Sequence, residues 1–174
     1  PRAQALAGEL GDGLITSIPR GGSIPTALAN ARTGAERAGR SMDDFYTTAL
    51  VNLVMLQPGE TLSSERVIAE CGTAIMANVH YLMDFVRETG SEPPEVVRPI
   101  WEEYLDFHRS RDAASSGQKL HESHYSFLDP DEACFITPQM IRAFCLAGQP
   151  EELVEQLREL ESQGLKAISF ITPE

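Results

Sequence analysis

The sequence predicts an α/β fold built around parallel strands. Segments with helical periodicity and short apolar segments alternate in the order α-β-α-β, then about 80 residues that are helical throughout, then α-β. The apolar segments are short and rich in β-branched residues, which is typical of strands buried on both faces. Three strands separated by helices fit half of a (β/α)8 TIM barrel better than a complete sheet.

The last helix and strand show this pattern most clearly. Pro150 stands at a first helical position, where its missing N–H costs little, and Glu151 and Glu152 follow where the helix dipole favours negative charge. Gly164 then supplies a left-handed helix end. The apolar segment Ala167–Ile171 comes next and is predicted to be a buried strand.

The same signals place the earlier elements. Apolar residues recurring every three to four positions predict helices over residues 2–10, 23–38, 63–88, 95–112 and 137–146. Short apolar segments bounded by glycine or proline predict strands over residues 14–16 and 45–56. Ser23 and Thr137 each precede a proline in a first helical turn, so we expect both to be N-caps.

We expect one incomplete domain in three parts. Residues 1–62 form the first αβαβ part, residues 63–136 form a helical insertion, and residues 137–174 form the final helix and strand. A parallel strand needs neighbouring strands, and few are predicted here. We therefore expect a fragment of a barrel that forms a homo-oligomer through its exposed strand edges and apolar surfaces.

Composition excludes several classes of partner. The 174 residues carry a net charge of −12, which disfavours nucleic acid and anionic membranes as partners. No apolar run approaches the roughly 20 residues that span a bilayer. Cys71, Cys134 and Cys145 show no metal-binding spacing, so we expect small core residues and a reducing cytoplasm. The glycine motifs of Rossmann and P-loop nucleotide sites do not occur.

Three stretches carry a family resemblance. Residues 1–15 look like a helix followed by barrel strand six, residues 29–40 look like the helix ending in Ala-Gly-Arg before strand seven, and residues 148–153 look like the start of the helix before strand eight. Together they resemble the luciferase-like monooxygenases and flavin- or deazaflavin-dependent oxidoreductases. The pattern is most similar to members labelled methylenetetrahydromethanopterin-reductase-like or F420-dependent.

The resemblance implies a TIM-barrel enzyme that transfers hydride between a cofactor, the deazaflavin coenzyme F420 or FMN, and a small organic substrate. The family's active site lies at the C-terminal ends of the strands. By this resemblance the chain is the C-terminal half of the barrel, with the helical insertion between strands seven and eight. Strands one to five, which form much of the pocket, are not in this sequence, so we expect the isolated chain to be inactive. The alternative is a non-catalytic α/β interaction module that self-associates.

The resemblance also points to four site residues. Thr16, Ser17 and Arg20 follow the first strand, where the family binds the cofactor phosphate, and hydroxyl and guanidinium groups suit that ligand. Arg142 lies where family members can place a cation for an anionic substrate or cofactor. The alternatives are a polar strand end and a surface arginine.

The histidines do not predict a metal site. His121 and His124 are three residues apart in the densest polar stretch, which can be an active-site lid, a metal site or ordered surface. His80 and His108 are expected to be packing or surface residues. Asn52 lies near the end of the middle strand and could face the mouth of the barrel. We therefore expect no bound metal.

Overall fold

The computed structural model describes residues 1–17, 23–112 and 126–171. The chain divides into two compact units. We call Pro1–Met55 with Gly148–Glu174 the sheet unit, and Leu56–Ala147 the helical unit. Each is described by itself. In the described residues, no helix is both long enough and apolar enough to cross a membrane.

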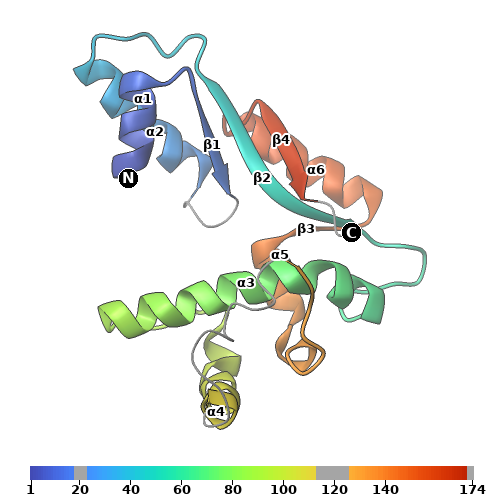
Figure 1. The fold of residues 1–174 in the computed structure, drawn as a ribbon. Helices are drawn as coiled ribbons and strands as arrows, with labels where there is room; N and C mark the ends of the chain where they lie inside the picture. The colour runs from blue at the N-terminus through green and yellow to red at the C-terminus, as the bar shows by residue number, and fades with distance from the viewer. Residues whose placement is uncertain (18–22, 113–125, 172–174) are drawn as a thin grey trace. The chain divides into compact units, whose positions relative to one another are not determined.

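The sheet unit is built from parallel strands and helices (Figure 1). Its helices are α1 (Arg2–Leu10), α2 (Ile24–Arg37) and α6 (Pro150–Ser162). Its strands are β1 (Gly13–Ser17), β2 (Tyr46–Met55) and β4 (Ala167–Ile171). Both outer strands pair with β2 in parallel, so β2 lies between them. The predicted α/β class with a parallel sheet is confirmed.

Local side-chain chemistry fixes the helix ends of this unit. The hydroxyl of Ser23 accepts a hydrogen bond from the backbone N–H of Thr26 at 3.3 Å, as an N-cap should. The backbone N–H of Gln149 donates to the carboxylate of Glu152 at 2.8 Å within a capping box. Gly164 has φ +102°, which a glycine adopts without strain.

Two glycines allow α1 and α2 to pack closely. A Cβ atom built on Gly8 would lie 1.8 Å from the carbonyl oxygen of Ala31, and one built on Gly34 would lie 1.8 Å from that of Ala5. No side chain fits at such distances. The two helix backbones therefore touch directly, through small residues on both sides.

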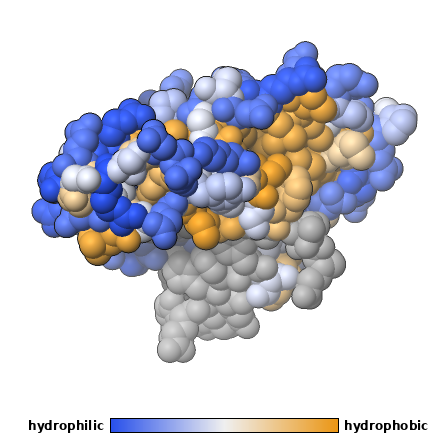
Figure 2. Space-filling model, turned by 90° about the horizontal axis from the view of Figure 1, so that it is seen from above, coloured by the Kyte–Doolittle hydropathy of each residue, from blue (hydrophilic) through white to orange (hydrophobic). Residues whose placement is uncertain are grey.

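The parallel sheet of this unit has one face covered along β2, which we call the covered face, and an opposite, open face. On β4 the covered side is itself partly exposed, because Phe170, which pairs with Val51, is 52% exposed. Along β2, Thr47, Ala49 and Val51 are buried, whereas Tyr46 and Leu50 between them are exposed. Neighbouring strand residues point to opposite faces, so the exposed set shares one side of the sheet. Viewed from above, the molecule shows hydrophobic surface lying open beside hydrophilic surface (Figure 2).

The open face continues onto β1. Ile15 pairs in register with Thr48 of β2, so its side chain lies on the same side as those of Tyr46 and Leu50. The Ile15 side chain is 70% exposed. This apolar face is where we would expect further protein or a ligand to pack.

The helical unit encloses its own core. Its helices are α3 (Glu65–Thr89), α4 (Trp101–Asp112) and α5 (Pro138–Phe144), with 3-10 turns η1 (Arg98–Ile100) and η3 (Ala133–Phe135). The N-cap predicted at Thr137 is confirmed, because its hydroxyl accepts a hydrogen bond from Met140 N–H at 3.2 Å. Val67, Ile75 and Ile141 are completely buried.

Two boundaries differ from the sequence prediction. The helix expected over residues 95–112 begins at Trp101, because η1 comes first and Pro99 within it cannot donate a backbone hydrogen bond. The helix expected to reach residue 146 ends at Phe144, and the short strand β3 (Leu146–Gly148) follows. The described residues therefore contain four strands rather than the expected three.

Candidate functional site

The predicted cofactor residues lie at the end of β1. Thr16 and Ser17 are its last two residues, and they pair with Ala49 and Leu50 of β2. Both side chains are half-buried. Since neighbouring strand residues face opposite ways, Ser17 shares the open face with Leu50, whereas Thr16 shares the covered face with Ala49. Arg20 lies outside the described residues.

The carboxyl ends of the parallel strands bring a second polar side chain to this edge. Asn52 of β2 pairs with Ile171, the last residue of β4. Asn52 is half-buried and is two residues from Leu50, so it lies on the open face with Ser17. The open face therefore offers apolar surface with a hydroxyl and an amide near its carboxyl edge. Such a surface suits a flat ring carrying polar substituents.

The predicted substrate residue lies in the other unit. Arg142 is in the last turn of α5 and its side chain is exposed. An exposed guanidinium is available to an anion. The structure therefore places Thr16 and Ser17 at the same strand end but on opposite faces of the sheet, whereas Arg142 belongs to the separate helical unit. His121 and His124 lie outside the described residues.

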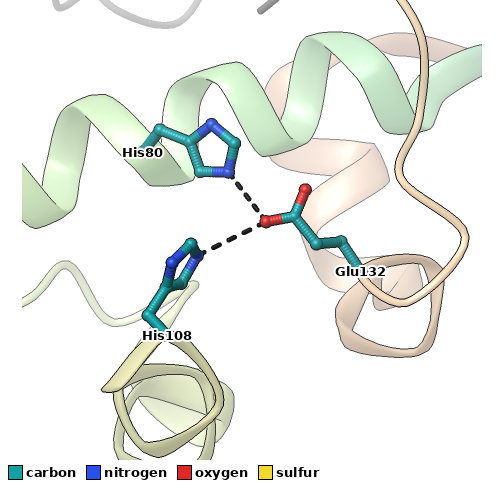
Figure 3. A group of neighbouring side chains, drawn as sticks. All are labelled: His80, His108 and Glu132. Carbon is teal, nitrogen blue, oxygen red and sulfur yellow. Dashed lines mark hydrogen bonds and ion pairs between the residues drawn. The ribbon is translucent and has the colours of Figure 1, made fainter. Parts of the chain in front are cut away.

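A buried polar cluster in the helical unit was not predicted. It consists of His80 on α3, His108 on α4 and Glu132, the N-cap of η3 (Figure 3). Nε2 of His80 lies 2.9 Å from Oε1 of Glu132, and Nε2 of His108 lies 3.4 Å from the same oxygen. Three elements far apart in the sequence thus meet at one carboxylate oxygen.

Tyr104 completes this cluster. Its hydroxyl donates a hydrogen bond to Oε1 of Glu132 at 2.6 Å. The ring of Tyr104 meets that of His108 edge to face, with centroids 4.6 Å apart, and meets that of Phe135 at 5.0 Å. Aromatic rings therefore wall the cluster. Tyr104 is fully buried, and Glu132 is only 3% exposed.

The surroundings keep Glu132 charged. Burial by itself acts to raise the pKa of this carboxyl group, but His108, His80 and Tyr104 around it outweigh burial and hold the pKa well below its usual range. Burial and the charge of Glu132 raise the pKa of Tyr104 far above its usual range. The cluster therefore presents an ionised carboxylate with a phenol hydrogen-bonded to it.

The sequence carried only a weak signal for this cluster. Tyr104 and His108 are four residues apart on a helix, and His80 lies beside the apolar stripe of α3. Each is an ordinary position for a packing residue. Nothing local connects either histidine to Glu132, which stands in a polar stretch far from both histidines in the sequence. The association is a product of tertiary packing.

Two cysteines of the helical unit lie close together. Cys71 and Cys145 are both buried. A hydrogen bond with Cys145 is the main cause that lowers the pKa of Cys71, and the same bond together with burial raises the pKa of Cys145. Their burial matches the expectation of small core residues. Cys134 is exposed.

Comparison with known proteins identifies the family. A family model described as Luciferase-like monooxygenase matches residues 1–167. The chain belongs to this family. The resemblance to the luciferase-like oxidoreductases seen in the sequence is therefore confirmed.

Individual relatives agree with this family. The 5,10-methylenetetrahydromethanopterin reductase of Archaeoglobus fulgidus is 25% identical over 175 residues, which is 99% of this chain and 46% of that protein. The chain thus spans less than half the length of this curated relative.

Two solved structures are similar. One is the coenzyme F420 dependent tetrahydromethanopterin reductase from Methanopyrus kandleri, with 22% identity, a TM-score of 0.49, and coverage of 95% of this chain and 40% of that one. The other is an F420-dependent secondary alcohol dehydrogenase in complex with an F420-acetone adduct, with 16% identity, a TM-score of 0.47, and coverage of 98% and 40%.

Proposed function

We propose that this chain is the C-terminal part of a coenzyme F420-dependent oxidoreductase. The observation that carries the proposal is the family match over residues 1–167, together with a reductase relative that aligns along 99% of the chain. Solved relatives are named as F420-dependent. The reaction class is hydride transfer between the deazaflavin ring and a small organic substrate, in a cytoplasmic enzyme.

We propose that the sheet unit supplies the last strands of a barrel. In this arrangement β1, β2 and β4 are barrel strands six, seven and eight, and the helical unit is an insertion between the last two. The order of elements supports this, because Leu56–Ala147 lies between β2 and β4 in the chain. The open face of the sheet would then face the barrel core, and its carboxyl edge would lie at the mouth of the barrel, where the active sites of such barrels form.

The residues at the carboxyl edge fit such a cofactor. Ile15 and Leu50 offer apolar surface to a ring, while Asn52 lies on the same face and can hydrogen-bond to its polar edge. Bound there, the deazaflavin would supply the hydride chemistry itself. The chain's residues would hold and orient the ring and exclude water from it.

The cationic side chains would bind the phosphate of the cofactor and an anionic group of the substrate or cofactor. Of the predicted phosphate residues Thr16, Ser17 and Arg20, we assign the phosphate of the cofactor to Ser17 and Arg20, because hydroxyl and guanidinium donors match phosphate oxygens. Thr16 lies on the covered face, opposite to Ser17. Arg142 would bind an anionic group of the substrate or cofactor. FMN is the alternative cofactor and monooxygenation the alternative reaction, as the family's description indicates.

A fluorescence titration tests this proposal. Coenzyme F420 and FMN would each be added to the 174-residue chain and, in parallel, to the product of the complete gene. We expect saturable F420 binding by the complete product and weak or no binding by the chain alone, because much of the family's pocket belongs to earlier strands. Failure of both proteins to bind either cofactor would overturn the oxidoreductase assignment.

Variants of the complete product locate the phosphate site. Ser17→Ala and Arg20→Ala should each weaken F420 binding about tenfold or more, since each removes a charge-assisted hydrogen bond. Ser162→Ala is the matched control, because the Ser162 hydroxyl donates to the carbonyl of Glu159 in its own helix. If all three variants bind F420 with equal affinity, the phosphate binds at another site.

The exposed apolar face supports a second proposal, that the isolated chain self-associates without catalysis. Ile15 and Tyr46 are more than half exposed on a sheet whose outer strands each pair on one side with β2. Light scattering at about 1 mg/mL should therefore give a mass above that of one chain. A single species of 19.1 kDa would contradict this proposal.

A further inference from the structure

We propose that His80, His108 and Glu132 bind a divalent transition-metal ion, for which zinc is the test ligand. This inference is independent of the proposed function, because the three residues lie within the helical unit alone. It also departs from our expectation that the sequence holds no metal site. Two imidazoles and a carboxylate are a ligand set typical of zinc and of related divalent ions.

The spacing of the ligand atoms suits such an ion. One nitrogen from each histidine and one oxygen of Glu132 all lie within 4.8 Å of one another. A zinc ion bonded at about 2.1 Å to nitrogen and oxygen holds tetrahedral ligands about 3.4 Å apart. The 2.9 Å and 3.4 Å separations of the two Nε2 atoms from Oε1 already lie near that value. Small side-chain movements would complete the geometry.

The hydrogen-bond arrangement favours a cation over a closed network of side chains. Tyr104, His80 and His108 all converge on one oxygen of Glu132. An ionised carboxylate oxygen has about two acceptor positions, so three donors exceed its capacity. Nε2 of His108 is the excess donor: it is buried and lies 3.4 Å from that oxygen, without a well-formed hydrogen bond in the described part of the chain. A bound ion would give that nitrogen a partner.

The groups around the ligands match the outer shell of a metal site. The Tyr104 hydroxyl fixes the orientation of the Glu132 carboxylate at 2.6 Å, and outer hydrogen bonds of this kind strengthen metal binding. The ring of His108 packs edge to face against Phe107 and Tyr104. The pocket is dry, with His80 only 1% and His108 only 9% exposed. The ion would link α3, α4 and the turn at Glu132.

Calorimetry with zinc tests the proposal. The full 174-residue chain would be treated with a chelator, dialysed, and titrated with zinc chloride. We expect one zinc per chain with a dissociation constant in the micromolar range or below. His108→Gln and Glu132→Gln should each weaken binding about a hundredfold, and Tyr104→Phe about tenfold, because an outer-shell group contributes less than a ligand.

The control removes the other two histidines. The double variant His121→Gln/His124→Gln leaves the cluster intact and should bind zinc like the wild-type chain. If it loses the binding while His108→Gln keeps it, the ion belongs to that polar stretch and the proposal is wrong. Failure of the wild-type chain to bind zinc at equimolar ratio would also overturn it.

Adding cobalt to the wild-type chain tests the site even if a cluster variant fails to fold. Cobalt added to the wild-type chain should give visible absorption bands of a four-coordinate nitrogen and oxygen site, which zinc then displaces. Bands of six-coordinate aqueous cobalt would contradict a built site. Circular dichroism of each variant shows whether its helices are retained, so loss of binding in a folded variant counts as loss of a ligand.

Discussion

The two units of this chain differ in which side chains they expose and which they bury. The sheet unit leaves Ile15 open to solvent at the end of a parallel sheet, whereas the helical unit buries the carboxylate of Glu132 among aromatic rings. An open apolar face indicates a surface that functions when something covers it. A closed polar cluster indicates a core that is complete in itself, or that lacks only an ion.

Replacing matched isoleucines should show the largest difference between the two units. Ile75 of α3 is completely buried, so Ile75→Ala should destabilise the chain by about 2–5 kcal/mol through lost burial and a cavity. Ile15 is mostly exposed, so Ile15→Ala should cost no more than about 1 kcal/mol, the range of strand propensity. Urea unfolding followed by circular dichroism measures both.

A large destabilisation by Ile15→Ala would contradict the expected difference between the two units. It would mean that the open face is covered in solution. Repeating the unfolding at several protein concentrations shows whether a second copy of the chain or the same chain covers the face, because stability gained through association grows with concentration. A cost at Ile15 that vanishes on dilution would support self-association through the sheet.

Adding a single methyl group at Gly34 should give the next largest loss of stability. In Gly34→Ala the new Cβ would meet the carbonyl oxygen of Ala5 at 1.8 Å, so α1 and α2 must separate. We expect a loss of about 1–3 kcal/mol from overpacking, although alanine favours a helix by up to about 1 kcal/mol. Ala29→Ser adds one atom at an exposed position of the same helix and should be nearly neutral. Thermal unfolding of both variants measures this, and a stabilised Gly34→Ala would contradict the close packing.

Much of the secondary structure could be predicted because its signals are local. Ser23, Thr137 and Gly164 act through atoms within a few residues, and the structure shows each in the expected place. The strands at Ala167–Ile171 and after Gly11 followed from short apolar segments next to helix ends. The three-residue strand Leu146–Gly148 was missed because it is too short to show alternation.

The candidate sites could be predicted less well, for a different reason in each unit. Ser17 and Asn52 share a face only because the register of β1 and β2 is fixed, and sequence gives a strand's alternation but not its register. His80 and Glu132 meet only after three helices and turns have packed. Burial of charged groups without a local motif is a property of the fold, so only the structure revealed it.

The smallest expected effect is a pH dependence of stability that comes from Glu60, near the start of the helical unit. The carboxylate of Glu60 accepts hydrogen bonds from Arg66 and from the backbone N–H of Gln57 at 2.7 Å. The Arg66 guanidinium is the main cause that lowers the pKa of Glu60 from 4.5 to about 2. Because the folded-state pKa lies below the unfolded value, this ionised group stabilises the fold above about pH 4.5, and the contribution disappears as pH falls toward 2.

Glu60→Gln should remove that part of the pH dependence. Urea midpoints at about pH 6 and about pH 3 would be compared for the wild-type chain and the variant, and the wild type should lose slightly more stability on acidification. Glu36→Gln, at an exposed position of α2 in the sheet unit, is the matched control and should follow the wild type. If Glu60→Gln shows the same acid loss as the wild type, solvent screens this ion pair completely, and acid stability of the helical unit depends on other carboxylates.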